Sequence, residues 1–157
     1  SGAHCDARVA QRMDAWRNMS AASYLRWAQA RKGCVAQVSA RIARFDAMRS
    51  PATPITAPLL AAVAPASALD PAQDAARDAA FVTANALLLR NTSVVNMLDG
   101  CALSIPCHLP GELPMGLMLW HGAGRDDALL NLGLLAESSL LTEALRQGAQ
   151  RAQPLHC

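Results

Sequence analysis

The chain has 157 residues and a formal net charge of +2; 52% of its residues are hydrophobic and 17% are charged. A chain of this length is the size of one domain, here residues 1–157, and can bury roughly two-thirds of its unfolded surface. The chain begins with no basic-then-apolar leader, and no apolar run approaches the roughly twenty residues of a membrane span. We therefore expect a cytoplasmic protein with no membrane partner.

The charges are unevenly distributed. Residues 1–50 hold nine Lys/Arg and three Asp/Glu, a sum of +6, whereas the remainder holds five and nine, a sum of −4. A basic segment of this kind either attracts phosphate groups, forms a helix face exposed to water, or contacts an acidic surface in another part of the protein or in a partner. Because the sequence has neither a Gly-rich phosphate loop nor interleaved aromatic residues, we do not expect nucleic acid as a partner.

The cysteines indicate a reducing compartment. There are five, an odd number, and no Cys-x-x-Cys pair is present, so a disulfide framework is not expected. Cys101 and Cys107 bracket an expected strand, whose length would hold them beyond disulfide reach.

The first elements predicted along the chain are two helices. Residues 6–18 have helical composition, with Val9, Met13 and Trp16 on one side. Residues 24–45 carry apolar residues at steps of three and four, which predicts an amphipathic helix capped by Ser20 or Ser23. We expect its apolar stripe to pack on the body of the protein. The stripe consists of Tyr24, Trp27, Cys34, Val35, Val38, Ile42 and Phe45.

A short strand at residues 46–50, a loop and a further helix are expected next. Pro51 should end the strand, because proline cannot donate to a ladder. Residues 51–70 are rich in proline and alanine and are predicted to be an extended or irregular loop. Pro71 and the acidic residues Asp74 and Asp78 favour a helix over residues 72–88, since both suit a helix N-terminus.

The most informative stretch is residues 89–127, where two apolar runs flank a Pro/Gly turn. Neither run alternates polar with apolar residues, which is typical of strands buried on both faces and predicts a core hairpin. Asp126 or Asp127 then opens a leucine-rich helix that ends near residue 147, with Gly148 as the stop. The fold class expected is α+β, with a small mixed or antiparallel sheet flanked by long helices.

Ordered motifs along this stretch resemble the C-terminal third of the amidase signature family. The matching positions are Arg90, Thr92, Asn96, Ala102, Ser104, Pro106, Cys107, Leu113, Pro114, Gly116, Leu117 and Asp126. Upstream, the segment at residues 45–54 looks like the family's Asp-x-Leu-x-x-Pro-Thr-x-Pro motif. The sequence departs from the common pattern at Asn91, at residues 99–101, and at His108 and Glu112, which replace glycines. Its form at residues 96–102 is closest to allophanate hydrolase and its relatives.

The resemblance implies amide hydrolysis by a Ser nucleophile, a second Ser held through a cis peptide and a Lys base, all in a Gly/Ser-rich segment. This sequence lacks that segment. Its only lysine is Lys32, on a predicted surface helix, and its Ser-Ser pair, at residues 138–139, falls in the leucine-rich helix. Cys107 and His108 are neighbours on an expected strand and should point to opposite faces. We therefore expect no catalytic residue, no metal and no cofactor.

We expect this chain to contribute one wall of the substrate pocket of such an enzyme. The residues of this wall are Arg90, Asn91, Asn96 and Asp99. Arg90 either clamps a carboxylate through two parallel hydrogen bonds or pairs with a structural residue such as Asp99. The resemblance thus implies the C-terminal portion of an amidase that acts on a small amide and is inactive alone. Its apolar surface would be covered by a missing N-terminal amidase portion or by a second copy in a homodimer. The alternative is a noncatalytic module, derived from an amidase, that binds a small molecule or a protein.

Overall fold

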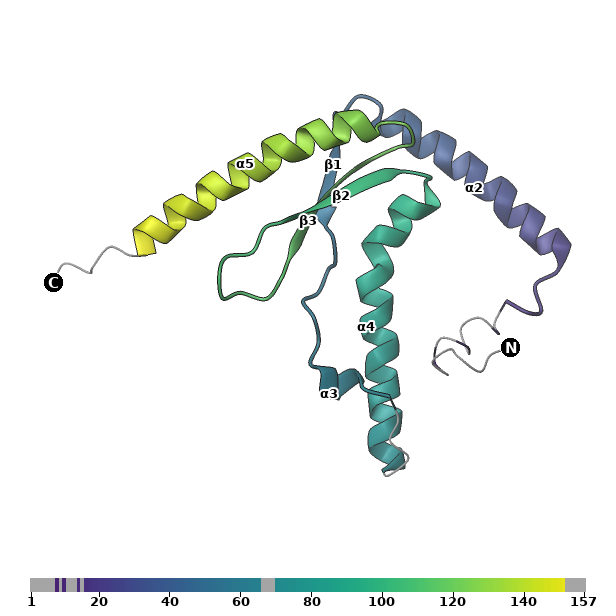
Figure 1. Ribbon diagram of the computed structural model, residues 1–157. Helices are drawn as coiled ribbons and strands as arrows, with labels where there is room; N and C mark the ends of the chain where they lie inside the picture. The colour runs from purple at the N-terminus through teal and green to yellow at the C-terminus, as the bar shows by residue number, and fades with distance from the viewer. Residues whose placement is uncertain (1–7, 9, 11–13, 15, 66–69, 152–157) are drawn as a thin grey trace.

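The computed structural model describes residues 8, 10, 14, 16–65 and 70–151. Within these residues the fold is α+β, with four helices and one three-stranded antiparallel sheet (Figure 1). The helix expected at residues 6–18 lies for the most part outside the described residues. Long helices extend away from a small sheet in different directions, so much of each helix has no neighbour in the described part of the chain.

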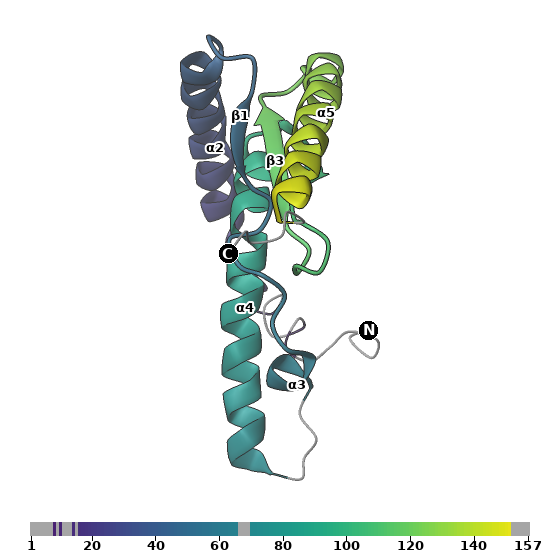
Figure 2. The ribbon, with the colours of Figure 1, turned by 90° about the vertical axis from the view of Figure 1, so that its left-hand side faces the viewer.

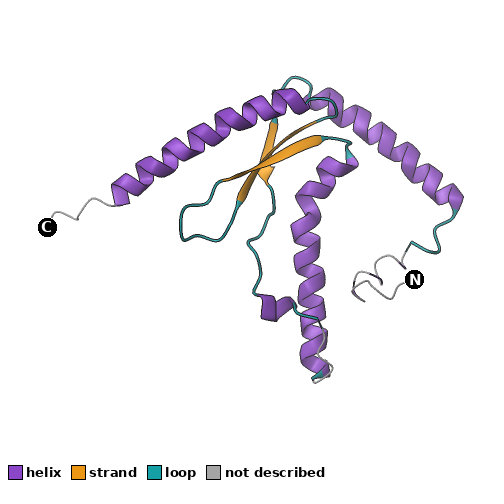
Figure 3. Cartoon of the chain, viewed as in Figure 1, coloured by secondary structure: helices purple, strands orange, loops and turns teal. Residues whose placement is uncertain are grey.

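The sheet is formed by β1 (Met48–Pro51), β2 (Cys101–Pro106) and β3 (Gly116–His121), in the order β1-β3-β2. The predicted hairpin is confirmed: β2 and β3 pair antiparallel (Figure 3). The expected burial on both faces holds for the central strand β3, which exposes none of its residues. It is wrong for β2, where Ala102 and Ser104 are exposed, because β2 is an edge strand covered on one face.

The core lies between the sheet and helix α5 (Asp126–Arg151). Its buried centre is Ile105, Leu119 and Leu129, one side chain from each of β2, β3 and α5. Gly133 allows the helix to approach closely, since a Cβ there would lie 2.9 Å from a methyl carbon of Leu103. The helix begins at the predicted residue but continues through Gly148, so the predicted stop was wrong.

Helix α4 (Pro71–Met97) has the predicted start and a later end than predicted. The Asp70 carboxylate accepts hydrogen bonds from the N–H groups of Ala72 and Gln73, and proline occupies the first turn. The end expected near residue 88 was wrong, because nothing before Gly100 breaks the helix. Residues 88–97 therefore belong to α4 and not to an approach to the hairpin. The loop at residues 51–70 contains only a one-turn helix, α3 (Leu60–Val63), in its described part.

Helix α2 (Ala21–Ile42) is capped by Ser20, one of the two predicted candidates, whose hydroxyl accepts a hydrogen bond from the Ser23 N–H at 3.1 Å. Its apolar stripe is fully buried only at the C-terminal end, where Ile42 is 7% exposed, while Cys34, Val35 and Val38 in the middle are half-buried. Tyr24 and Trp27 are 63% and 66% exposed, so the expectation that the whole stripe is packed was wrong. The reason is the arrangement of the helices. Figure 2 shows α2 and α5 on opposite sides of the sheet, and Figure 1 shows the N-terminal part of α2 extending beyond the sheet.

Candidate functional site

The four residues predicted to line a substrate pocket lie at the C-terminal end of α4. Arg90, Asn91 and Asn96 are on the helix itself, and Asp99 is in the turn that leads to β2, with a φ of 54°. Positions one or five residues apart on a helix do not share a face. The structure therefore does not bring the four side chains into one pocket.

Asn91 connects two segments that are distant in sequence. Its Nδ2 donates a hydrogen bond of 2.8 Å to the carbonyl oxygen of Pro51, at the end of β1. The Arg90 side chain is exposed, and its Nε lies 3.5 Å from Asn91 Oδ1. Asn91 thus satisfies a backbone acceptor and fixes α4 against the sheet, whereas Arg90 stays accessible.

Asp99 is engaged by a residue that the sequence did not indicate. Its Oδ1 accepts a hydrogen bond from Nη2 of Arg31 at 2.5 Å, which links the turn after α4 to α2. The suggested Arg90–Asp99 pair is therefore replaced by an Arg31–Asp99 pair. Both partners are partly exposed, with side-chain exposures of 40% and 61%.

We predict a small effect for Asp99→Asn. Exposed ion pairs contribute about 0.2 to 1 kcal/mol, and asparagine tolerates the positive φ as well as aspartate does. The free energy of unfolding should fall by less than about 1 kcal/mol, which the midpoint of urea unfolding would report. Asp99→Ala should cost more, because alanine adopts the left-handed conformation less readily. An equal, large loss for both variants would contradict this reading and make the ion pair the dominant interaction.

The motif segments that carry the amidase resemblance meet around β3. The Ala52 N–H donates to the Gly116 carbonyl oxygen at 2.8 Å. Pro106 and Gly116 face each other in the ladder, and a Cβ on Gly116 would lie 2.3 Å from Ser104 Oγ and 3.2 Å from Ala52 Cβ. Residues 50–52, 104–106 and 116–117 therefore lie side by side in the sheet, and a side chain at position 116 would have to displace the Ser104 hydroxyl.

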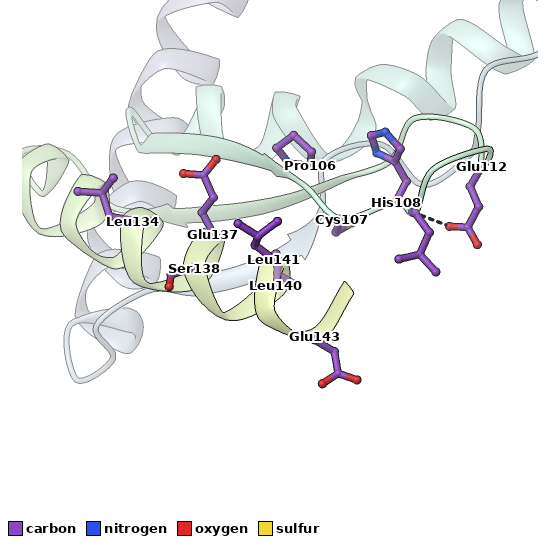
Figure 4. Close-up of a pocket in the computed structure, with 11 residues that line it drawn as sticks. Pro106, Cys107, His108, Glu112, Leu134, Glu137, Ser138, Leu140, Leu141 and Glu143 are labelled. Carbon is purple, nitrogen blue, oxygen red and sulfur yellow. Dashed lines mark hydrogen bonds between the residues drawn. The ribbon is translucent and has the colours of Figure 1, made fainter. Parts of the chain in front are cut away.

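The described part of the chain also contains an open groove with a volume of about 770 Å³ (Figure 4). The loop after β2 forms one side of the groove, and the middle of α5 forms the other. Its lining residues are Pro106, Cys107, His108, Leu109, Glu112, Leu134, Glu137, Ser138, Leu140, Leu141 and Glu143. None of the four residues predicted to bind substrate lines it.

His108 and Glu112, which stand where the resembled family has glycines, shape this loop. Glu112 Oε2 accepts the Leu109 N–H at 2.9 Å, and His108 Nδ1 accepts the Met115 N–H at 3.3 Å. The Cys107 thiol donates to the Met115 carbonyl oxygen at 3.6 Å. Cys107 and His108 thus both turn to the backbone of Met115, and no hydrogen bond between them is found among the described residues.

Other chemistry is sparse in the described part of the chain. Lys32 is exposed on α2, and Ser139 Oγ donates to the Leu135 carbonyl oxygen of its own helix at 2.9 Å. Within the described ranges no group of three or more His, Cys, Asp or Glu side chains is placed to hold a metal ion. Nor does any described helix have the length and apolarity to cross a membrane.

Comparisons with protein-family models, with curated proteins and with solved structures each gave no match.

Proposed function

We propose that this chain is the C-terminal portion of an amidase-signature hydrolase, which cleaves the C–N bond of a small amide. In this proposal the chain supplies part of the sheet and a wall of the substrate pocket, formed by the α4 end that carries Arg90 and Asn96. The nucleophile, the relay serine and the lysine base belong to a segment outside the 157 residues. Alone, the chain does not hydrolyse amides.

One observation carries the proposal: motifs separated by some fifty residues, which resemble one family in the same order, pack together around Gly116. The Asn91 hydrogen bond to Pro51 connects two of these segments, and the contact between Gly116 and Ser104 connects two others. Residues 104–106 and 116–117 lie in the paired strands β2 and β3, and residues 50–51 pair with β3 as part of β1.

The exposed surface of α4 supports the proposal that a further part of the protein covers this helix. The helix has four charged residues in 27, and three of them, Asp74, Arg77 and Asp78, lie on its packed side toward the N-terminal end. Its exposed face carries Val82, Leu89, Val94 and Met97, with Arg90 as the single charge, beside several alanines. The exposed residues Thr83, Thr92 and Ser93 are polar but uncharged, and large apolar side chains on such a surface are typical of one that another part of a protein covers.

Seven apolar side chains are buried in the described residues, whereas seventeen large ones are exposed. A monomer rarely leaves so much apolar surface in contact with water. The proposed hydrolase would cover the exposed face of α4 with the portion that holds the catalytic segment.

The proposal predicts that the purified chain releases no ammonia from malonamide, acetamide or allophanate. An antibody against this chain should instead precipitate, from cells that express the natural gene, an assembly or longer polypeptide that does release ammonia. A fluorophosphonate probe should label a serine of that assembly outside these 157 residues, as a nucleophile activated by a base requires.

The control is the same precipitation after preincubation of the antibody with the purified chain, which should remove the activity. A saturable amidase rate from the pure chain would contradict the proposal, as would a natural product that contains no reactive serine outside the chain.

A further inference from the structure

The outer side of β2 carries backbone groups that no other strand uses. Strand β2 is one edge of the sheet, with no neighbour beyond it in the described part of the chain. The Cys107 N–H donates to the Met115 carbonyl oxygen at 3.0 Å, so the hydrogen-bonded pairs of the β2–β3 ladder are those of odd-numbered residues. The N–H and C=O groups of Ala102 and Ser104 therefore point away from β3. Both residues are exposed, and neither N–H has a hydrogen-bond partner among the described residues.

The opposite edge of the sheet, formed by β1, is closed to a further strand. The Ala52 N–H donates to the Gly116 carbonyl oxygen, so the backbone groups of the residues at 49 and 51 point outward. Pro51 has no N–H, and its carbonyl oxygen already accepts the side-chain amide of Asn91. Arg49 is exposed and adds a charge to this edge. Charges and prolines keep edge strands from pairing, whereas β2 has no charge and a proline only at its last residue.

The free backbone groups of β2 are symmetrical about Leu103. Ala102 precedes it and Ser104 follows it, and the next outward position on each side supplies no free donor. Pro106 has no N–H, and the Gly100 N–H is already donated to the last turn of α4. An identical strand that runs antiparallel, with the two Leu103 residues opposite each other, would place each Ala102 against the Ser104 of the other copy. Each such pair would exchange both backbone hydrogen bonds, so every free donor of the edge would be used.

Helix α5 provides apolar surface beside the same edge. It lies close to β2 at Gly133, where an added Cβ would be 2.9 Å from a methyl carbon of Leu103. Leu132 packs against the core cluster, whereas Leu134, on the opposite side of the helix, is 67% exposed. A two-fold axis between the two Leu103 residues therefore brings the two α5 helices together near Leu134. This contact would cover apolar side chains in addition to the strand pairing.

We propose that two copies of this chain form a dimer in which their β2 strands pair antiparallel and join the two sheets into one. The two-fold axis is perpendicular to the sheet, so both copies use the same edge, and the assembly closes at two copies because the β1 edges are blocked. In such strand addition the main-chain hydrogen bonds supply affinity and the neighbouring side chains supply specificity. The dimer leaves the exposed face of α4 free, so it does not depend on the proposed amidase function.

Sedimentation velocity under reducing conditions tests the dimer with two substitutions at one position. The wild-type chain, of 16.6 kDa, should sediment as a species of twice that mass. Ser104→Pro removes an outward N–H that the ladder with β3 does not use. It should raise the dissociation constant at least about tenfold, because a hydrogen bond is lost from both symmetrical pairs. Ser104→Ala is the matched control, since it keeps the N–H and should leave the dimer unchanged.

A second pair of variants tests the α5 contact without altering the sheet. Leu134→Glu should dissociate the dimer, because two carboxylates would then lie beside each other at the axis. Leu135→Glu, which is equally exposed at 67% but lies on the other flank of the helix, should not. Amide hydrogen exchange provides a direct measurement, because the N–H groups of Ala102 and Ser104 should exchange more slowly at protein concentrations at which the dimer forms.

A monomeric wild-type chain would overturn the proposal. So would a dimer that Ser104→Pro leaves intact, or amides of Ala102 and Ser104 that exchange equally fast at every protein concentration. Dissociation by Val82→Glu in place of Ser104→Pro would assign the interface to α4 and would also overturn it. If circular dichroism shows that Ser104→Pro does not fold, Leu134→Glu and the exchange of the two amides decide the question.

Discussion

Replacing Gly100 by alanine should lower the free energy of unfolding by about 2 to 3 kcal/mol, the cost typical of an added group in a filled site. A Cβ at this position would lie 2.5 Å from the carbonyl oxygen of His121 and 2.9 Å from Cγ1 of Val95. The oxygen belongs to the backbone and cannot rotate away, because His121 faces Cys101 in the ladder between β2 and β3. The new methyl group therefore has to push the start of β2 away from β3.

Gly33→Ala is the control for this prediction. A Cβ on Gly33 would have no atom within 4 Å other than those of its two neighbours and of the surrounding helix backbone, and the residue lies inside α2. Alanine should raise the free energy of unfolding there by about 0.5 to 1 kcal/mol, since it loses less backbone freedom in a helix. Urea unfolding followed by circular dichroism, at one protein concentration, would measure both. Equal midpoints for Gly100→Ala and the wild-type chain would show that the hairpin start is not held as the structure has it.

Features that depend on neighbouring residues were predictable from the sequence. The Ser20 cap, the acidic and proline-bearing start of α4, and the start of α5 all follow from side chains that satisfy or complement the first N–H groups of a helix. The hairpin followed from two apolar runs around a Pro/Gly turn. These interactions operate within a few residues, so the local sequence specifies them.

Features that depend on distant residues were not predictable. The sequence showed an apolar stripe on α2, but whether Trp27 is covered depends on where the rest of the chain ends in space. Arg31 and Asp99 are 68 residues apart, and Asn91 is 40 residues from Pro51, so no local pattern indicated either contact. The groove likewise combines a loop with a helix that begins some twenty residues later. Consequently the sequence predicts the pocket residues at a strand entry, whereas the structure places Arg90, Asn91 and Asn96 on α4 and Asp99 in the turn after it.

Leu129→Ala should be the most costly truncation in the described core. The Leu129 side chain is 2% exposed and packs with Ile105 and Leu119 between α5 and the sheet. Removing a buried leucine side chain loses its burial and leaves a cavity, at a cost of about 2 to 5 kcal/mol. The expected result is a large shift of the urea midpoint to lower concentration, measured by circular dichroism and by tryptophan fluorescence, to which Trp120 in β3 contributes.

The neighbouring residue supplies the matched control, because Leu130→Ala makes the same chemical change one position along the same helix. Leu130 is 59% exposed, so its truncation should change the free energy of unfolding by no more than about 0.5 kcal/mol. The pair decides which face of α5 meets the sheet. Leu130 and Leu134 are one turn apart, so they share the outward face that borders the groove. If Leu130→Ala proved the more costly, the helix would be rotated, Leu134 would be buried, and the groove would lose its apolar wall.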